Sequence, residues 1–317
     1  MKYKIFVDGQ EGTTGLKIFD YLSEREDLEI LKIDPDKRKD PEERRKYLNE
    51  ADIAFLCLPN SASIESASLV TSKNTRLIDA STAFRTDDAW TYGLPELNKK
   101  QRDIIRKSKK VSNPGCYATG FIMAVNPLVQ QGILPKDYPV SCAALSGYSG
   151  GGKKLIEKYG NPDPEDKSLN SPKHYALKLD HKHLPEMQKH TGLAYPPLFT
   201  PIVSSYYKGM TVSVPLVPRL LSKKVSPADV RDLLAEYYSS ERFVRVLPYE
   251  ADQYLENGFL NTEACNDTNM IDIFVFGHNN QILLVSRLDN LGKGASGAAI
   301  QNMNIMLGLD EGIGLKV

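Results

Sequence analysis

The stretch Lys2–Leu16, KYKIFVDGQEGTTGL, decides the fold that this sequence predicts. Its first part, KYKIFVD, is typical of a buried β-strand, and three glycines follow it within a short turn. From Leu16 to Glu24 the apolar residues recur at helical spacing. A glycine turn between a strand and a helix lets the backbone approach a pyrophosphate. The start of the helix adds free N–H groups and the positive end of its dipole.

The glycines of this turn have G-x-x-G-x-x-G spacing rather than the usual G-x-G-x-x-G. A glycine triplet alone also fits a tight turn with close helix packing. The second predicted strand, Glu29–Asp34, ends in an acid, and this context favours dinucleotide binding. The candidate cofactor-binding residues of the turn are Gly9, Gly12, Thr13, Thr14 and Gly15.

The charges after the second strand bear on which dinucleotide binds. Asp34 favours a ribose 2′-hydroxyl and hence NAD, whereas the basic run Lys37–Lys39 could bind the 2′-phosphate of NADP. Taken singly, each of these basic residues also fits a solvated charge run. The residues themselves leave both cofactors open.

Strands and helices alternate through the first part of the chain. After a helix expected at Lys37–Glu50, strands are predicted at Ile53–Leu58 and Arg76–Asp79, with a helix at Ser63–Val70 between them. This alternation predicts an α/β fold with a doubly wound parallel sheet of the Rossmann type.

The pattern changes further along the chain. A helix is predicted over Gly120–Gln131 and a strand over Val140–Ser146, and strand-like runs with turns follow in 203–217 and 270–285. A second, more antiparallel domain is therefore expected. Residues Gly294–Leu307 predict a final helix.

Composition and charge exclude several classes of function. The 40 basic residues balance the 40 acidic ones, so no basic excess points to nucleic acid. The apolar runs have the length of strands, so no membrane partner is expected, and no signal peptide is recognised. The four cysteines have neither CxxC spacing nor a neighbouring histidine cluster, so neither zinc nor a disulfide framework is expected. We therefore expect a reduced, cytoplasmic protein.

Cys116 is the candidate nucleophile. It follows Asn113–Gly115 and precedes the predicted helix, so we expect it at a helix start, where a thiol pKa can fall below its free value of about 8.5. The N–H groups of the same turn could hold an oxyanion formed at a carbonyl. The alternative is a small buried hydrophobe, and that interpretation is applied to Cys57, Cys142 and Cys265.

A thiolate nucleophile needs an acid–base partner, and four of the five histidines lie within residues 174–190. Their densest part reads HKHLPE. Pro185 is tolerated in the first turn of a helix, so His183 is predicted at a helix edge with Glu186 one turn on. We predict His183 as the acid–base residue and His181 as a residue that contacts substrate or shapes the loop. Their spacing, without a third ligand nearby, does not favour a metal site.

These segments resemble N-acetyl-gamma-glutamyl-phosphate reductase in its shorter form (type 2), a family of the aspartate-semialdehyde dehydrogenase-like superfamily. Asn113–Gly120 is similar to the family's active-site signature, Gly9–Leu16 to its nucleotide turn and His181–Glu186 to its H-x-H-x-P-E segment. Further matches are Asp289–Leu291, Lys293–Gly297 and Gln301–Asn304. The resemblance covers nearly the whole chain.

The resemblance implies an organisation and a reaction. It implies an NADP-binding Rossmann domain over 1–115, completed by a C-terminal helix within 293–317, and an α+β catalytic and dimerisation domain over 116–292. The expected cofactor is NADP, and the expected substrate is N-acetylglutamyl 5-phosphate. Cys116 would form a thioester and release phosphate, giving N-acetylglutamate 5-semialdehyde for arginine biosynthesis. A homodimer or homotetramer is expected.

Two further segments gain a meaning from the resemblance. Ser81–Arg85 resembles the family's S-A-D-F-R segment but departs from it at Thr82 and Ala83, and Arg85 could bind a carboxylate or phosphate instead of being a surface cation. Ser146–Lys153 resembles the family's S-G-x-S-G-x-G turn, whose consecutive N–H groups and lysine could bind an anion. The resemblance thus adds candidates for substrate binding, which are Arg85, Ser149, His181 and Glu186, and for cofactor binding, which is Asn302.

Other functions remain open at this point. A related enzyme could reduce aspartyl phosphate. A thiol hydrolase could use Cys116 and His183 without any nucleotide turn, and a nucleotide-sensing protein could have lost the chemistry.

Overall fold

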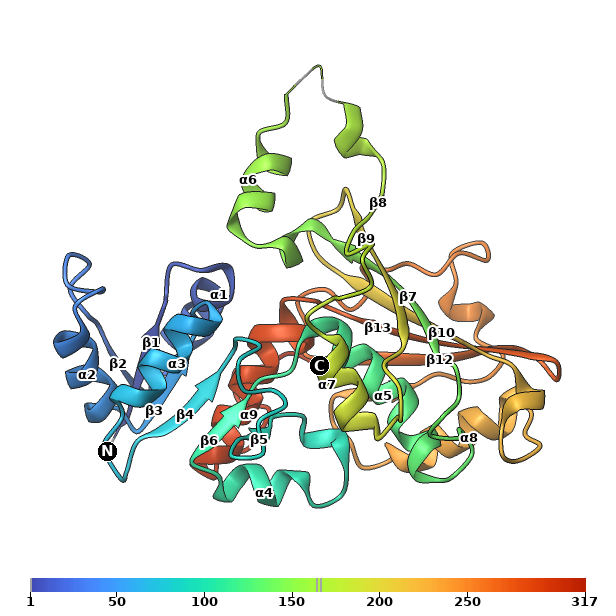
Figure 1. Cartoon of the computed structure of the whole chain (residues 1–317), viewed down its shortest axis with the longest axis horizontal. Coiled ribbons are helices and arrows are strands. Elements are labelled where there is room, and N and C mark those ends of the chain that lie inside the picture. The colour runs from blue at the N-terminus through green and yellow to red at the C-terminus, as the bar shows by residue number, and fades with distance from the viewer. Residues whose placement is uncertain (1, 164, 166) are drawn as a thin grey trace. The chain divides into compact units, whose positions relative to one another are not determined.

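The computed structural model of the chain describes residues 2–317 except 164 and 166, and it separates into two compact units (Figure 1). The first unit contains the chain up to Gly115 together with Ala295–Leu315. The second contains Cys116–Gly294 and the last two residues. Across the described residues, no helix is both long enough and apolar enough to cross a membrane.

The first unit is built on a six-stranded sheet in the order β2-β1-β3-β4-β6-β5, and each neighbouring pair of strands runs parallel. The strands are β1 (Tyr3–Asp8), β2 (Leu28–Leu31), β3 (Ile53–Leu56), β4 (Arg76–Asp79), β5 (Thr91–Tyr92) and β6 (Lys110–Ser112). The helices are α1 (Thr13–Ser23), α2 (Pro41–Glu50), α3 (Asn60–Leu69), α4 (Gln101–Lys107) and α9 (Gly297–Leu307), with a 3₁₀ turn at Pro95–Leu97.

Alternation along β1 sends its side chains into two separate cores. Ile5 and Val7 pack with residues of α1, α4 and α9, whereas Phe6 packs with residues of α2 and α3. Helices therefore cover both faces of the sheet, and the predicted doubly wound α/β fold is confirmed. Because the strands are parallel, β1 and β6 lead out of the same sheet edge, one into the glycine turn and the other toward Cys116.

The end of the second strand differs from the prediction. β2 pairs with β1 only over Leu28–Leu31, so Asp34 lies beyond the strand. There its Oδ1 atom accepts the Asp36 N–H at 3.0 Å. The next helix begins at Pro41 rather than at Lys37, because Asp40 caps it by accepting the Glu42 N–H. The basic run Lys37–Lys39 therefore lies in the connecting turn, where all three residues are exposed.

The second unit holds a seven-stranded mixed sheet in the order β11-β12-β13-β10-β7-β9-β8. Four of its strand pairs are antiparallel, and β7/β9 and β11/β12 are parallel, which agrees with the more antiparallel domain predicted. The strands are β7 (Ser141–Gly147), β8 (Lys173–His174), β9 (Leu198–Ser204), β10 (Met210–Leu216), β11 (Val244–Val246), β12 (Ile271–His278) and β13 (Gln281–Leu288).

The helices of this unit are α5 (Cys116–Gln130), α6 (Lys153–Gly160), α7 (Leu184–Thr191) and α8 (Pro227–Tyr237). Short 3₁₀ turns occur at Tyr148–Gly151, Lys167–Asn170, Pro218–Leu220 and Asp252–Tyr254, and a π-helical turn at Gly292–Ser296 leads into α9. Helix α5 is buried along Tyr117–Val129 and packs on the sheet. A side chain on Gly120 would lie 2.8 Å from Val212, so this glycine allows the close approach.

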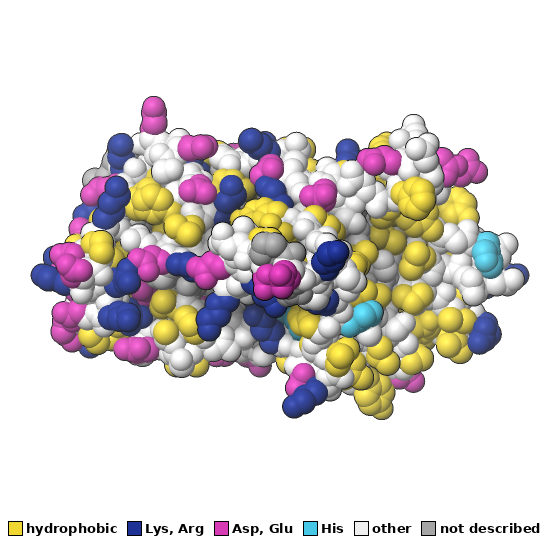
Figure 2. Space-filling model, turned by 90° about the horizontal axis from the view of Figure 1, so that it is seen from above, with side chains coloured by type: hydrophobic (Ala, Val, Ile, Leu, Met, Phe, Trp, Pro, Cys, Tyr) yellow, Lys and Arg dark blue, Asp and Glu magenta, His cyan; other side chains and the backbone are white. Residues whose placement is uncertain are grey.

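The sheet of the second unit keeps one apolar face open. On β7, Cys142 and Ala144 are buried, whereas Ala143 and Leu145 are exposed. Leu145 pairs with Ile202 in the parallel register with β9, and Leu198 at the start of β9 is 54% exposed. Hydrophobic side chains gather on the surface of this unit (Figure 2).

Candidate active site

Two glycines of the nucleotide turn are required by close backbone contacts. Gly9 has φ +88°, and a Cβ there would lie 2.4 Å from the Cys57 carbonyl oxygen. A Cβ at Gly15 would lie 2.4 Å from the Gly9 carbonyl oxygen. The turn therefore packs against the end of β3 and against its own helix in a way that excludes any side chain at these two positions.

The start of α1 is suited to an anion. The helix begins at Thr13 after Gly12, no side chain caps it, and its first turn carries no acidic residue. The first backbone N–H groups of a helix lack partners within the helix, and together with the dipole they bind phosphate groups. The side chain of Arg38 forms an ion pair with Glu11, which brings a cation to the glycine turn. These residues fit the pyrophosphate of a dinucleotide.

Arg85 and Asn302 lie on either side of the segment that leads toward Cys116. Arg85 is buried, and it donates from Nε to the Asn113 carbonyl oxygen at 2.9 Å and from Nη2 to that of Ala80 at 3.2 Å. The surface-cation alternative for Arg85 is therefore wrong. Asn302 is fully buried and donates from Nδ2 to Gly93 O at 2.8 Å and to Asn113 Oδ1 at 3.2 Å. Their predicted roles in binding substrate and cofactor stay predictions.

Cys116 is the first residue of α5, which confirms the predicted helix start. A Cβ on Gly294 would lie 2.8 Å from Cys116 Cβ, so glycine at that position keeps room beside the cysteine. The thiols of the other cysteines are poor nucleophiles, because burial keeps them protonated. It raises the pKa of Cys57 and Cys142 far above the ordinary value, and that of Cys265 to about 12.

The two histidines form one hydrogen-bonded unit. His183 is the N-cap of α7, as predicted, and its N–H donates to His181 Nδ1 at 3.1 Å. Because Nδ1 of His181 accepts this bond, the proton of a neutral His181 ring resides on Nε2. The His183 Nε2 atom lies 4.0 Å from Glu186 Oε1, and both side chains are buried. The Glu186 carboxylate therefore lies beside the His183 ring within the same buried site.

Tyr117 brings the helix start of Cys116 together with the histidines. Its ring centroid lies 5.7 Å from that of His181 and 5.9 Å from that of His183. The Tyr175 hydroxyl donates to the Tyr117 hydroxyl at 3.0 Å. Burial raises the pKa of Tyr117 well above 10 and that of Tyr175 to about 12, so both remain phenols at neutral pH. Tyr175 carries no recognisable signal in the sequence.

The glycine turn after β7 is less open than predicted. The Tyr148 and Ser149 N–H groups donate to the carbonyl oxygens of Tyr206 and Tyr207, each at 2.9 Å, and the Gly152 N–H donates to Ser149 O at 3.2 Å. The prediction that consecutive N–H groups of this turn bind an anion is therefore wrong for these three. Ser149 itself is buried.

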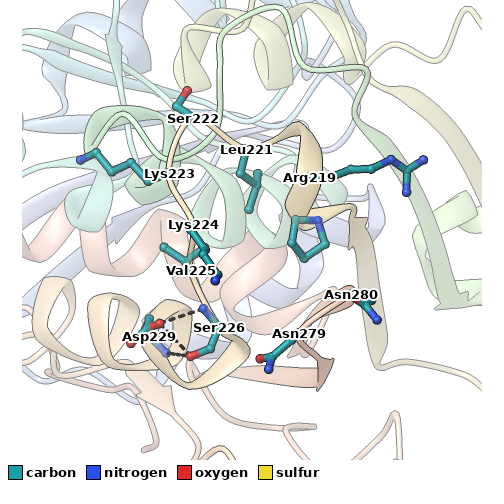
Figure 3. A pocket seen from close by; sticks show the side chains of 11 residues that line it. Arg219, Leu221, Ser222, Lys223, Lys224, Val225, Ser226, Asp229, Asn279 and Asn280 are labelled. Atoms are coloured by element: carbon teal, nitrogen blue, oxygen red, sulfur yellow. Dashed lines mark hydrogen bonds between the residues drawn. The ribbon is translucent and has the colours of Figure 1, made fainter.

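A cavity of 910 Å³ in the second unit is a different feature (Figure 3). None of the predicted site residues lines it. At its edge, the Ser226 N–H donates to Asp229 Oδ2 at 2.8 Å and the Asp229 N–H donates to Ser226 Oγ at 3.2 Å, so the start of α8 is capped by its own side chains. Within the described ranges 2–163, 165 and 167–317, no group of three or more His, Cys, Asp or Glu side chains could hold a metal ion.

The parallel sheet with its glycine turn, and the mixed sheet with its helix-start cysteine and His–Glu pair, agree with the semialdehyde dehydrogenase class, which two family models identify. The family model of the semialdehyde dehydrogenase NAD binding domain matches residues 4–105. The model of the semialdehyde dehydrogenase dimerisation domain matches residues 116–290.

Individual relatives narrow this class. N-acetyl-gamma-glutamyl-phosphate reductase 2 from Nostoc sp. is 50% identical over 320 residues, which cover 99% of this chain and 99% of the relative. This chain belongs to the N-acetyl-gamma-glutamyl-phosphate reductase family.

Solved structures of lower identity agree on the fold. Aspartate semialdehyde dehydrogenase from Francisella tularensis aligns with a TM-score of 0.72 at 14% identity, covering 96% of this chain and 100% of that one. Aspartate semialdehyde dehydrogenase with NADP from Candida albicans aligns with a TM-score of 0.65 at 15% identity, covering 97% of this chain and 99% of that one. At such identities the likeness bears on the fold alone.

Proposed function

We propose that this protein reduces N-acetyl-L-glutamyl 5-phosphate to N-acetyl-L-glutamate 5-semialdehyde, with release of phosphate, in arginine biosynthesis. The observation that carries this proposal is the grouping of the Cys116 helix start with His181, His183 and Glu186 in one unit of a reductase-family chain. An acyl phosphate suits a thiolate nucleophile, because phosphate is a good leaving group.

The first half of the reaction uses the start of α5. Cys116 Sγ, as a thiolate, forms a bond to the acyl carbon, and the bond from that carbon to the phosphate oxygen breaks. The N–H groups of the first helical turn stabilise the oxyanion that develops on the way. The product of this half is a thioester on Cys116. The covalent step divides one difficult reaction into two easier ones.

The second half uses the start of α7. NADPH, when bound by the glycine turn and the start of α1, supplies a hydride. His183, beside the Glu186 carboxylate, gives a proton to the oxygen of the resulting thiohemiacetal. When the carbon–sulfur bond breaks, the imidazole takes that proton back, the aldehyde leaves and Cys116 is again a thiolate.

The reverse reaction tests this function. Purified protein should reduce NADP with N-acetylglutamate semialdehyde only when phosphate is present, measured as NADPH absorbance. Aspartate semialdehyde is the control substrate, and a faster reaction with it would identify reduction of aspartyl phosphate instead. Ester hydrolysis without any nucleotide would identify a thiol hydrolase, and nucleotide binding without turnover would identify a sensor.

We expect the protein to prefer NADP over NAD. Arg38 lies at the glycine turn in an ion pair with Glu11, Lys37 and Lys39 are exposed beside it, and the Asp34 carboxylate already accepts the Asp36 N–H. If one charge-assisted hydrogen bond holds the 2′-phosphate, the Michaelis constant for NADP should be roughly tenfold to a hundredfold lower than that for NAD.

Arg38→Met should raise the Michaelis constant for NADP by that factor and leave the constant for NAD unchanged. Arg106→Met, which removes an exposed arginine from α4, is the matched control and should change neither. A lower Michaelis constant for NAD than for NADP in the unchanged protein would contradict the assignment.

We also infer a homodimer or homotetramer in which the open face of β7 and β9 is covered by another copy. Exposed apolar side chains such as Leu145 and Leu198 on that face support an interface. Leu198→Lys should raise the dissociation constant at least about a hundredfold, measured by sedimentation. Ile64→Lys, at an exposed position on α3, should leave the assembly intact; unchanged assembly in Leu198→Lys would exclude this face.

The four free cysteines suit the reducing cytoplasm, where we place the protein.

A further inference from the structure

We propose that Asn290 is a positioning residue that turns the hydroxyl group of Ser149 toward an anionic oxygen of the substrate. This rests on the proposed function, because Ser149 is a candidate for binding that substrate. Asn290 follows β13, and its side chain and that of Ser149 meet in the second unit although 141 residues separate them in sequence. Both residues are 2% exposed.

The orientation of the Asn290 amide follows from its partners. Its Oδ1 atom accepts the backbone N–H of Gly209 at 2.8 Å. A backbone N–H can only donate, so the oxygen of the amide must face Gly209 and the nitrogen must face Ser149. The distance from Asn290 Nδ2 to Ser149 Oγ is 2.9 Å. Asn290 is thus the donor in its bond to the serine.

This bond decides where the serine hydrogen can point. A hydroxyl group has one hydrogen and two lone pairs, and Asn290 occupies one lone pair. Among the residues that the structure describes, Asn290 is the side-chain partner found for the Ser149 hydroxyl. The hydrogen is therefore available as a donor, and a donor in a buried site suits a carboxylate or phosphate oxygen.

Gly150 lies directly beside the two hydrogen-bonded side chains. Gly150 has no side chain, and a Cβ there would lie 3.6 Å from Asn290 Nδ2 and 3.5 Å from Ser146 Oγ. The Ser146 hydroxyl in turn interacts with the Tyr117 hydroxyl, next to Cys116 in the chain. Gly150 therefore lies next to Asn290 and next to Ser146, whose hydroxyl group reaches the residue that follows Cys116.

The backbone holds both ends of the contact in place. The Ser149 N–H donates to Tyr207 O at 2.9 Å. On the other side, the carboxylate of Asp289 accepts the N–H groups of Leu291 and Asp267, each at 2.8 Å. A donor held in advance loses little freedom when the substrate binds, so the orientation of Ser149 should appear in substrate affinity.

The test is a double-variant cycle of Asn290→Asp and Ser149→Ala. In Asn290→Asp both side-chain oxygens accept: one keeps the Gly209 N–H, and the other takes the Ser149 hydrogen away from the substrate. Each single variant should raise one Michaelis constant about tenfold to a hundredfold, with kcat little changed. The double variant should show no larger rise than either single variant, because both remove the same hydrogen bond.

The reverse reaction separates the two possible oxygens, because phosphate and N-acetylglutamate semialdehyde are then separate substrates. A higher Michaelis constant for phosphate assigns the contact to the phosphoryl group. A higher Michaelis constant for the semialdehyde assigns it to the substrate carboxylate. Thermal unfolding and NADPH titration check that the variants are folded. If Asn290→Asp does not fold, Asn290→Ala frees the hydroxyl to rotate and should raise the same constant by less than Ser149→Ala does.

Two results would overturn the inference. One is an unchanged Michaelis constant in a folded Asn290 variant. The other is a double variant whose increase in the Michaelis constant equals the product of the two single increases. The new carboxylate at position 290 would then weaken substrate binding independently of Ser149. Failure of the proposed function looks different: the unchanged protein itself would not catalyse phosphate-dependent oxidation of the semialdehyde.

Discussion

Cys116→Ser is expected to lose at least about a thousandfold in turnover while it keeps its fold and its affinity for NADPH. The helix start at Cys116 can stabilise a thiolate, but a serine hydroxyl is far too weak an acid to ionise there near neutral pH. The rate of phosphate-dependent NADPH formation measures the loss. Mass spectrometry of protein quenched after mixing with substrate should show a covalent adduct on the unchanged protein and none on the variant.

The remaining cysteines provide matched controls. Cys57→Ser and Cys142→Ser should retain turnover apart from a cost in stability, because burial keeps both thiols protonated and Cys142 is packed within β7. Normal turnover in Cys116→Ser would rule out this nucleophile. Loss of the adduct in Cys57→Ser but not in Cys116→Ser would instead identify Cys57, which directly follows β3, as the nucleophile.

His183→Asn is expected to lower turnover about 100- to 10,000-fold with the affinity for NADPH unchanged, which is the usual worth of general acid–base help. His183 has the Glu186 carboxylate 4.0 Å from its Nε2 atom, whereas Nδ1 of His181 is engaged by the His183 N–H. His183 is therefore the ring placed to carry and release a proton. Single-turnover experiments with N-acetylglutamyl phosphate would measure thioester formation and hydride transfer separately. The loss should appear in the second half of the reaction.

His181→Asn is the control within the same loop. It should mainly raise the Michaelis constant of the substrate, because the His181 ring packs between Tyr117, Tyr175 and Phe199 and shapes the site. A larger fall in turnover for His181→Asn than for His183→Asn would mean that the two roles are reversed.

Much of the predicted fold and candidate site rests on signals that lie close together in the sequence. The strand, glycine turn and helix at the N-terminus lie within a few residues of one another, and so do Cys116 with its helix start and His183 with Pro185. Helix α4 and strand β6, which lie between Arg85 and Cys116, were not predicted. Their short segments have little periodicity of their own, and tertiary packing against α9 stabilises α4 instead.

The sequence by itself determined the strands and helices with a clear periodicity, the doubly wound sheet and the chemical types of the candidate residues, because these follow from apolar periodicity, glycine and proline positions and capping within short windows. Only the tertiary structure decided which of these residues meet. In the fold, Arg85 is buried against backbone carbonyl groups, and the N–H groups of Tyr148 and Ser149 donate to backbone carbonyl oxygens. The Ser149 hydroxyl group is hydrogen-bonded to Asn290. Such partners lie far apart along the chain, so their contact depends on the register of β7, β10 and β13 in one sheet, which no short window of sequence contains.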